Sequence, residues 1–231
     1  MKYALLDWDN TLRKGYSIFS WCNFLIEKAI INEDSLHKIN SIKQNYENGL
    51  ISHDDFAKTA CEIFVNYLQG ISVKKIAELE KEFIGIFKKA LFSFSEGILN
   101  CLENNDYKII IVSGAPKSLI KQCVAENKNI EVFGLEFEEN NNKYTGLVKT
   151  NYGFNKSEIV DLLIAKYGKP SIAFGDSSSD IYMLSESEKS VLIVSDQTKI
   201  ALYKADMLIY ESDSSSDVYK KIEFLLKNEV K

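Results

Sequence analysis

The 231-residue sequence has few of the residues from which disulfide frameworks and zinc sites are built. Its four cysteines, Cys22, Cys61, Cys101 and Cys123, are spread singly with no C-x-x-C pair, and its two histidines lie in polar stretches without metal-ligand spacing. We therefore expect no disulfide framework and no zinc site. The cysteines are interpreted as unreactive core thiols in a reducing compartment.

Arginine and long apolar runs are also scarce. Arg13 is the only arginine among 28 basic residues, so a mechanism that needs a guanidinium clamp on a carboxylate or phosphate has one candidate. With 33 acidic residues the net charge is −5, which gives no general attraction to nucleic acid or anionic lipid. No run of 18 apolar residues occurs, and the apolar stretch before Asp7 is too short for a signal peptide. We expect a cytoplasmic protein without a nucleic-acid or membrane partner.

The sequence does contain the material for a packed core, because 45% of its residues are hydrophobic and 12% aromatic. Its length suits one large domain, or a core domain that carries a smaller insertion. Residues 2–7 form a short apolar run without helical spacing, which predicts a buried strand. From about residue 17 to 92, apolar residues recur at helical spacing in three stretches with lysine and glutamate opposite, so we predict a small helical bundle there.

After residue 92, strands and helices alternate as they do in α/β folds. Asn155 and Glu158 have the spacing of a capping box, which predicts that a helix starts there. The three asparagines at 140–142 predict the turn of a hairpin. In chain order we predict a strand at 108–112, a helix ending near 124, a strand and hairpin over 130–150, strands at 171–174, 191–194 and 207–210, and a last helix after 216.

Pairs of aspartates follow two of the predicted strands. Asp7 and Asp9 come at the end of the first strand, and Asp176 and Asp180 follow the strand at 171–174. Ligand crevices of open α/β sheets lie beyond the carboxyl ends of their strands, so we expect these acids to converge. Close carboxylates repel one another unless a cation relieves them. Mg²⁺, which prefers oxygen ligands, is the expected occupant.

Groups that suit an anion are expected in the same crevice. Ser113 supplies a hydroxyl and Gly114 a backbone amide at the predicted start of a helix, where free N–H groups favour negative charge. Lys156 lies in the first turn of another helix, where a cation is unfavourable unless an anion binds beside it. Each feature by itself fits a plain turn or a solvated lysine. Together and in this order, they describe a phosphate ester site in which a carboxylate attacks phosphorus.

These motifs run through nearly the whole chain in the order Asp7-Trp8-Asp9-Asn10-Thr11-Leu12, Ser113-Gly114, Lys156 and Gly175-Asp176-Ser177-Ser178-Ser179-Asp180. In this the sequence resembles the haloacid dehalogenase superfamily of phosphohydrolases, and within it the phosphoserine-phosphatase-like subfamily IB. The resemblance implies an α/β core with a Rossmann-like, doubly wound and mostly parallel sheet, and an inserted α-helical cap. We expect the core domain at 1–16 and 93–231, and the cap domain at 17–92.

The resemblance also implies the roles of the first motif. Asp7 would be the nucleophile that forms an aspartyl-phosphate, and Asp9 would protonate the leaving oxygen and then activate water. Both would also be metal ligands, Asp9 through its backbone carbonyl. Thr11, counted with the phosphate-binding residues, would steady this loop.

The later motifs complete the implied site. Ser113, the Gly114 amide and Lys156 would hold the phosphoryl oxygens. Asp176 and Asp180 would join the Mg²⁺ site, with Asp176 as a direct ligand and Asp180 supporting the metal's water shell or orienting Lys156.

We predict from these features a Mg²⁺-dependent phosphatase that hydrolyses a small phosphorylated metabolite and is a monomer or homodimer. Two alternatives stay open: a phosphotransferase that uses the same intermediate, and a non-catalytic protein that binds only metal or phosphate. Phosphoserine is disfavoured as a substrate because residues 17–92 lack an arginine for its carboxylate, although Lys28 or Lys43 could partly substitute. Three aromatic residues near the insertion point are expected to pack in the core or to line the pocket, namely Tyr16, Phe19 and Trp21.

Overall fold

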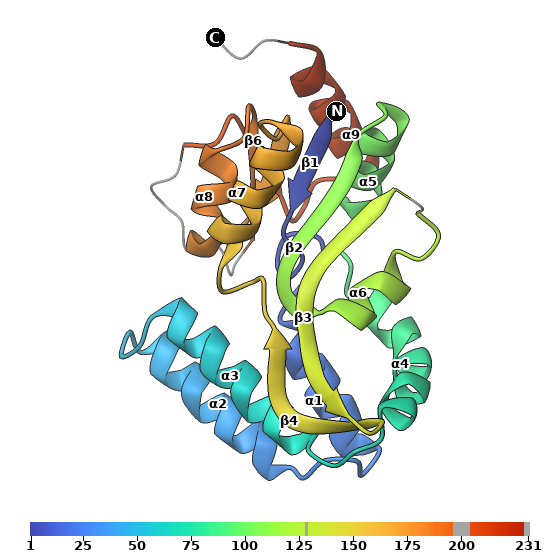
Figure 1. The fold of residues 1–231 in the computed structure, drawn as a ribbon. Coiled ribbons are helices and arrows are strands. Elements are labelled where there is room, and N and C mark those ends of the chain that lie inside the picture. Colours follow the sequence, from blue (N-terminus) through green and yellow to red (C-terminus); the bar gives the residue numbers. More distant parts are fainter. Residues whose placement is uncertain (128, 196–203, 229–231) are drawn as a thin grey trace.

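A computed structural model of the chain describes residues 1–127, 129–195 and 204–228 (Figure 1). The strands in these ranges are β1 (Tyr3–Leu6), β2 (Lys108–Pro116), β3 (Ile130–Asn140), β4 (Lys143–Thr150), β5 (Ile172–Gly175), β6 (Ser190–Val194) and β7 (Met207–Tyr210). The helices are α1 (Ser17–Glu27), α2 (Asp34–Glu47), α3 (His53–Tyr67), α4 (Val73–Lys88), α5 (Ser95–Asn104), α6 (Lys117–Cys123), α7 (Lys156–Tyr167), α8 (Ile181–Ser185) and α9 (Ser215–Lys227), and a 3-10 turn, Ser178–Asp180, precedes α8. None of the helices in the described ranges is both long and apolar enough to cross a membrane.

The strands form one sheet in the order β4-β3-β2-β1-β5-β6-β7. All neighbouring strands are parallel except β3 and β4, which run antiparallel. The chain starts in the middle of the sheet at β1, builds outward through β2 and β3, and then returns to the other side of β1 with β5. This reversal of strand order creates the crevice in which doubly wound sheets bind ligands. The predicted α/β fold with a mostly parallel sheet is confirmed.

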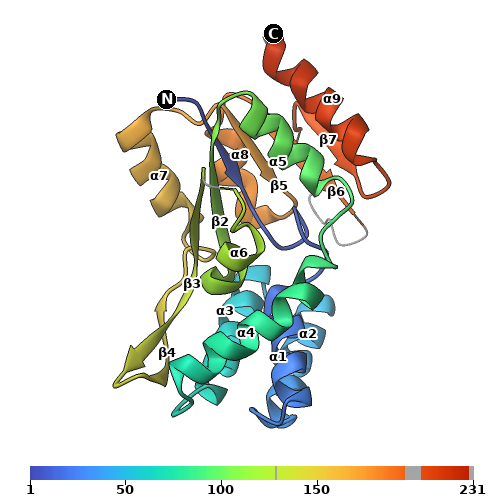
Figure 2. The same cartoon turned by 90° about the vertical axis from the view of Figure 1, so that its right-hand side faces the viewer.

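Helices cover both faces of the sheet, and the sequence of β1 explains why. Tyr3 and Leu5 belong to one buried cluster, which includes residues of α7 and α8, whereas Ala4 and Leu6 belong to another, which includes residues of α5 and α9. Alternate side chains of a strand point to opposite faces, so four consecutive buried residues require cover on both. Figure 2 shows α5 and α9 on one side of the sheet and α7 on the other.

Helices α1 to α4 pack around a cluster of aromatic rings. Trp21 and Phe24 of α1 stack with ring centroids 5.5 Å apart, and the Phe83 ring of α4 lies 5.0 Å from that of Trp21. Trp21 is fully buried and is therefore a core residue. The apolar pattern of the sequence predicts only three of these four helices. It misses α2 because only Ser35 and Ile39 are buried along that helix.

The β3–β4 hairpin extends from the sheet to the helical bundle (Figure 1). Asn141 and Asn142 form its turn, as predicted, with left-handed φ angles of 50° and 59°. Beside the turn, the Gly70 N–H donates to the Tyr144 carbonyl at 2.8 Å, and the Tyr144 N–H donates to the Ile71 carbonyl at 3.0 Å. The hairpin, which was assigned to the core domain, thus shares backbone hydrogen bonds with the predicted cap. The division into 1–16 with 93–231 and 17–92 stays a prediction.

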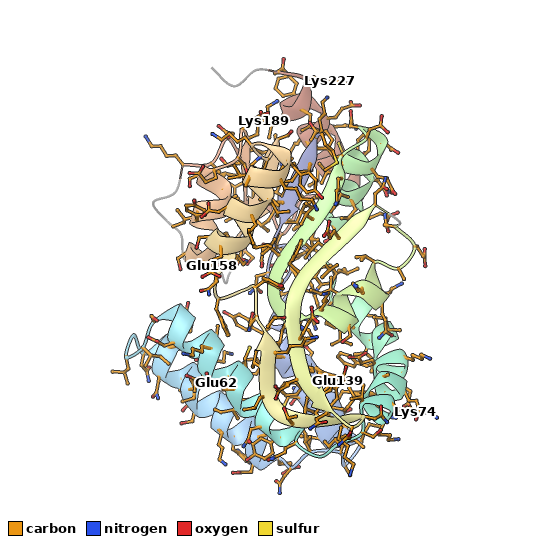
Figure 3. All side chains as sticks on the ribbon, viewed as in Figure 1. Glu62, Lys74, Glu139, Glu158, Lys189 and Lys227 are labelled. Carbon is orange, nitrogen blue, oxygen red and sulfur yellow. The ribbon has the colours of Figure 1, made fainter. Side chains whose placement is uncertain are left out.

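The start of α7 and the end of α9 differ in whether a side chain satisfies the terminal backbone groups. The capping box predicted at Asn155 does not form: the Asn155 side chain accepts no backbone N–H and instead donates to the Glu158 carboxylate at 3.3 Å. The Asn155 backbone, at φ −126° and ψ 50°, lies outside the extended region that an N-cap usually adopts. At the other end of the molecule, Lys189 donates to the Leu225 and Asn228 carbonyls and so caps the C-terminus of α9 (Figure 3).

Candidate active site

The carboxyl ends of β1 and β5 bring two of the predicted acids together. The Asp7 N–H donates to the Phe174 carbonyl at 3.0 Å, which continues the pairing of β1 with β5 by one residue. Asp176 follows two residues after Phe174, so both carboxylates emerge at the same edge of the sheet. Asp7 and Asp176 are 6% and 4% exposed. A polar cluster is therefore built into the end of a hydrophobic sheet.

Lys156 provides the positive charge of this cluster. Its Nζ lies 2.5 Å from Asp7 Oδ1 and 2.6 Å from Asp180 Oδ1. Burial disfavours the ammonium, but the carboxylates of Asp180 and Asp7 outweigh this and raise the pKa of Lys156. The first residue of α7 is thus a charged lysine held between two aspartates.

Asp180 is held in place from several directions. Its Oδ2 accepts hydrogen bonds from the backbone N–H groups of Asp176 and Ser177 at 3.0 and 2.9 Å, and from the Ser177 hydroxyl at 3.0 Å. Burial alone would raise the pKa of Asp180, but Lys156 and these hydrogen bonds hold it below its ordinary value. Gly175 makes room for this arrangement, because a Cβ there would lie 2.4 Å from the Cβ of Asp180. Asp180 is therefore an ionised, rigid anchor for Lys156.

The pKa values of Asp7 and Asp176 shift upward, opposite to that of Asp180. Burial is the main cause that raises the pKa of Asp7, to about 7, with Lys156 opposing it and Asp180 adding to it. Burial and the charges of Asp180 and Asp7 likewise raise the pKa of Asp176 well above its ordinary value. One ligand oxygen from each of Asp7, Asp176 and Asp180 lies within 4.8 Å of the others. Three carboxylates share one ammonium, so the cluster suits a further cation.

Asp9 lies apart from these three carboxylates but faces the same cavity. Its Oδ2 accepts the Ser17 N–H at 2.8 Å and its Oδ1 accepts the Ser17 hydroxyl at 2.5 Å. Asp9 therefore caps the N-terminus of α1 and connects the first motif to the helical bundle. Burial raises the pKa of Asp9, although Arg13 and Ser17 partly offset this.

Arg13, the one candidate for an anion clamp, does not serve as one. Its guanidinium lies 4.5 Å from the ring centroid of Phe87 and donates to the Ser20 hydroxyl and the Lys14 carbonyl. Nη1 is 3.9 Å from Asp9 Oδ1, and the residue is 2% exposed. Arg13 thus supports the loop that carries Asp9.

The predicted phosphate-binding residues differ in their surroundings. The Thr11 hydroxyl donates to Asp176 Oδ1 at 3.3 Å. This hydrogen bond suits a residue that steadies the loop and the Asp176 carboxylate better than a residue that contacts phosphate. Ser113 Oγ accepts the Ala115 N–H at 3.1 Å, which leaves its proton for another acceptor. Ser113 and Gly114 line the cavity.

Gly114 does not, however, stand at a helix start. β2 continues to Pro116, which pairs with Leu135 of β3, and α6 begins only at Lys117. The predicted strand at 108–112 is thus too short, because a register shift between Val112 and Pro116 lets the pairing resume after the polar residues. The Gly114 amide therefore gains nothing from a helix dipole.

The sequence model of the haloacid dehalogenase-like hydrolases matches residues 4–185, which is most of the chain. This chain belongs to that family. No curated protein matches it.

Solved structures of similar fold include several phosphatases. A substrate-bound phosphoserine phosphatase is 18% identical with a TM-score of 0.66, covering 96% of this chain and 98% of its own. A phosphoserine phosphohydrolase-like protein from Francisella tularensis subsp. tularensis SCHU S4 is 21% identical with a TM-score of 0.64, covering 90% and 95%. A cytosolic 5′-nucleotidase IIIB bound to cytidine is 15% identical with a TM-score of 0.66, covering 98% and 85%. At these identities the likeness shows the fold that this hydrolase shares with them.

One residue of this haloacid dehalogenase-like hydrolase that sequence reasoning misses is Gly153. A Cβ at Gly153 would lie 2.3 Å from the Gly114 nitrogen and 3.0 Å from the Ser113 carbonyl carbon. The loop before α7 thus packs directly on the backbone that presents Ser113 and Gly114. Asn151 supports the same loop by accepting the Gly153 N–H at 2.9 Å. No local motif marks this glycine, because the partner lies 39 residues earlier in the sequence.

We expect Gly153→Ala to destabilise the fold by about 1–3 kcal/mol, because the methyl group meets backbone that cannot move freely. Gly85→Ala is the matched control: nothing lies within 4 Å of a Cβ there, and alanine favours the interior of α4, so a gain of about 0.5–1 kcal/mol is expected. Urea unfolding measures both. Equal effects of the two substitutions would contradict the close approach at Gly153.

The cavity above the acids has a polar floor and an aromatic wall. The floor contains Asp7, Asp9, Asn10, Ser113, Gly114, Gly153, Lys156, Asp176, Ser177, Ser178 and Ser179, and the wall contains Tyr16, Ile18, Phe19, Tyr46, Phe56, Ala57, Ala60, Cys61 and Phe154. Tyr16 and Phe19 thus line the cavity, whereas Trp21 packs in the core. Burial raises the pKa of Tyr16, and Tyr46 and Asp176 add to this shift.

Proposed function

We propose that this hydrolase is a Mg²⁺-dependent phosphatase that cleaves a small phosphate monoester through an aspartyl-phosphate on Asp7. The observation that carries the proposal is the placement of Lys156 between Asp7 and Asp180, in a cluster whose third carboxylate is Asp176. A lysine and three acids at one end of a cavity suit a phosphate dianion and a divalent cation together. The phosphatases and the nucleotidase among the similar structures add support.

In the first step, a carboxylate oxygen of Asp7 attacks phosphorus, and the bond from phosphorus to the alcohol oxygen breaks. Asp9 gives a proton to that oxygen, and burial shifts its pKa upward, the direction that favours this role. Lys156 and the Ser113 hydroxyl, which line the cavity, would hold the oxygens of the transferred group. The products of this step are a free alcohol and an aspartyl-phosphate.

In the second step, water attacks the phosphorus of the aspartyl-phosphate. Asp9, now ionised, accepts the proton of that water, and the bond from phosphorus to the Asp7 oxygen breaks. Orthophosphate leaves and the Asp7 carboxylate is restored. Ser17 binds both oxygens of Asp9 and so orients this carboxyl group.

The donor set fits Mg²⁺, because the clustered ligand atoms are all carboxylate oxygens and carry more negative charge than Lys156 neutralises. Asp7 and Asp176, together with the backbone carbonyl of Asp9, would hold the ion, and Asp180 would support its water ligands. When bound, the ion would neutralise charge on the phosphoryl oxygens. We also propose a cytoplasmic location, which the four unpaired and buried cysteines support, and a monomer or homodimer.

The proposal is tested by measuring orthophosphate release and melting temperature with Mg²⁺ or with a chelator. We expect wild type to release phosphate only with Mg²⁺, and saturating Mg²⁺ at about 100 times its dissociation constant to stabilise the fold by about 2.7 kcal/mol. Asp176→Asn should lose most of both effects, whereas Asp106→Asn, at an exposed turn, should keep them. Hydrolysis that continues without divalent metal, or an unchanged Mg²⁺ effect in Asp176→Asn, would contradict the proposal.

A further inference from the structure

The wall of the cavity is a continuous aromatic surface from three separate segments. Phe56 of α3 lies at its centre, with ring centroids 5.6 Å from Tyr16, 6.2 Å from Phe19 and 5.3 Å from Tyr46. The Tyr46 and Phe56 rings are stacked at 5°, and Tyr16 meets Phe56 edge to face at 76°. Phe56 is 2% exposed and fixed in place, while the other three rings are partly exposed around the cavity. The part of a ligand that extends from its phosphate toward the wall would contact these rings.

Small side chains leave space in front of the rings. Ala57, Ala60 and Cys61 follow Phe56 on α3 and also line the cavity. Residues three and four apart share one face of a helix, so Phe56 and Ala60 lie in one row and Ala57 and Cys61 in the next. A ring at either alanine would fill this space. Within the wall, the hollow is therefore bounded by rings and backed by methyl and thiol groups.

The described side chains that α1 to α3 contribute to the cavity carry no charge. Lys28 and Lys43, the lysines considered for a substrate carboxylate, do not line the cavity: Lys28 binds Glu82 at 2.5 Å, and Lys43 lies 3.4 Å from Glu47 with its Nζ 5.8 Å from the ring centroid of Phe19. A carboxylate or ammonium on the leaving group would lose water here without gaining an ionic partner from the side chains of α1 to α3 that line the cavity. The wall thus disfavours charged leaving groups such as serine.

We propose that the leaving alcohol of the substrate carries an uncharged aromatic group that binds against Tyr16 and Phe19, which Phe56 supports from behind. The inference rests on the proposed phosphatase function and specifies its substrate class. Aromatic pairs contribute more than their buried area alone, and their edge-to-face and stacked geometries match the arrangement of rings already present in the wall. The charged phosphate and the flat apolar group would then occupy the two halves of the cavity.

Three primary alkyl phosphates with similar leaving oxygens test the inference: 2-phenylethyl phosphate, glycerol 3-phosphate and O-phosphoserine. We expect kcat/KM of wild type with Mg²⁺ to be about 30-fold higher for 2-phenylethyl phosphate than for the other two, as burial of a phenyl group implies. Equal values, or a preference for either polar ester, would overturn the inference while leaving the phosphatase function intact. Release of phosphate from none of the three would instead contradict the proposed function.

Variants of the wall separate this preference from the chemistry. Phe19→Ala should reduce the ratio of kcat/KM for 2-phenylethyl phosphate over glycerol 3-phosphate by about tenfold, since a partner ring is lost. Ala57→Leu should reduce the same ratio by filling the hollow, without removing a core side chain. Phe224→Ala is the control, because Phe224 is 69% exposed on α9 at the opposite end of the molecule and should leave the ratio unchanged (Figure 2). An unchanged ratio in both wall variants would overturn the assignment.

Discussion

Asp7→Asn is expected to lower kcat for phosphate release by roughly six orders of magnitude, the scale seen when a catalytic nucleophile is removed. The amide cannot displace an alcohol from phosphorus, so no covalent phosphoryl intermediate can form. The fold should persist, because asparagine has nearly the same volume and its Oδ1 can still accept the hydrogen bond from Lys156. The loss would then be chemical rather than structural.

Two measurements establish this result. Initial rates of orthophosphate release give the loss of activity, and mass spectrometry of acid-quenched protein shows whether phosphate becomes attached to the wild type and not to the variant. Asp106→Asn is the control, since Asp106 is exposed in the turn before β2 and has a left-handed φ of 60° that asparagine tolerates. Phosphate attached to Asp7→Asn, or activity near the wild-type level, would refute the role of Asp7.

Lys156→Met is expected to affect both stability and activity. Methionine fills a similar volume but leaves Asp7 and Asp180 facing each other without their ammonium. Removing one partner of a buried ion pair costs about 3–5 kcal/mol, because the remaining charge stays buried and unpaired. Activity should fall by about 10²–10³-fold, as expected for the loss of a group that stabilises phosphoryl charge.

The destabilisation should depend on pH and on metal. Lys156 holds the pKa of Asp180 below its ordinary value, so the stability it contributes is present above the ordinary pKa of aspartate and is lost as the pH falls through the lowered value. Urea unfolding of Lys156→Met at neutral pH, with a chelator and with Mg²⁺, should show a smaller deficit when Mg²⁺ is bound. Lys121→Met, at an exposed position of α6, is the control. A variant as stable as wild type in the chelator would show that Lys156 does not neutralise the cluster.

Much of the candidate site is predictable because its residues follow strands. Asp7 and Asp176 come at the ends of short apolar segments, and parallel strands place such residues at one edge of a sheet. Lys156 is predictable for a similar reason, since it opens a helix next to that edge. These patterns can be recognised locally in the sequence. The topology of an α/β fold then brings the residues that follow them close together in space.

Other predictions fail where local preference competes with other contacts. The Asn155 side chain fits an N-cap by residue type, yet the Glu158 carboxylate takes its amide. Gly114 is predicted at the start of a helix, yet pairing of Pro116 with Leu135 keeps it in a strand. For Gly114 the deciding partner lies on a neighbouring strand, whereas for Asn155 it lies three residues along the chain.

The sequence by itself determined the α/β fold, the order of the motifs and the acids that meet beside Lys156, because each depends on spacing along the chain. Only the tertiary structure decided which residues form the aromatic wall, that Gly153 contacts Gly114, and that Ser17 donates its hydrogen bonds to Asp9. The wall joins Tyr16, Tyr46 and Phe56 from separate segments, and aromatic residues at helical spacing look the same in a sequence whether they face a core or a cavity. Which of the two they face depends on how the helices pack against the end of the sheet.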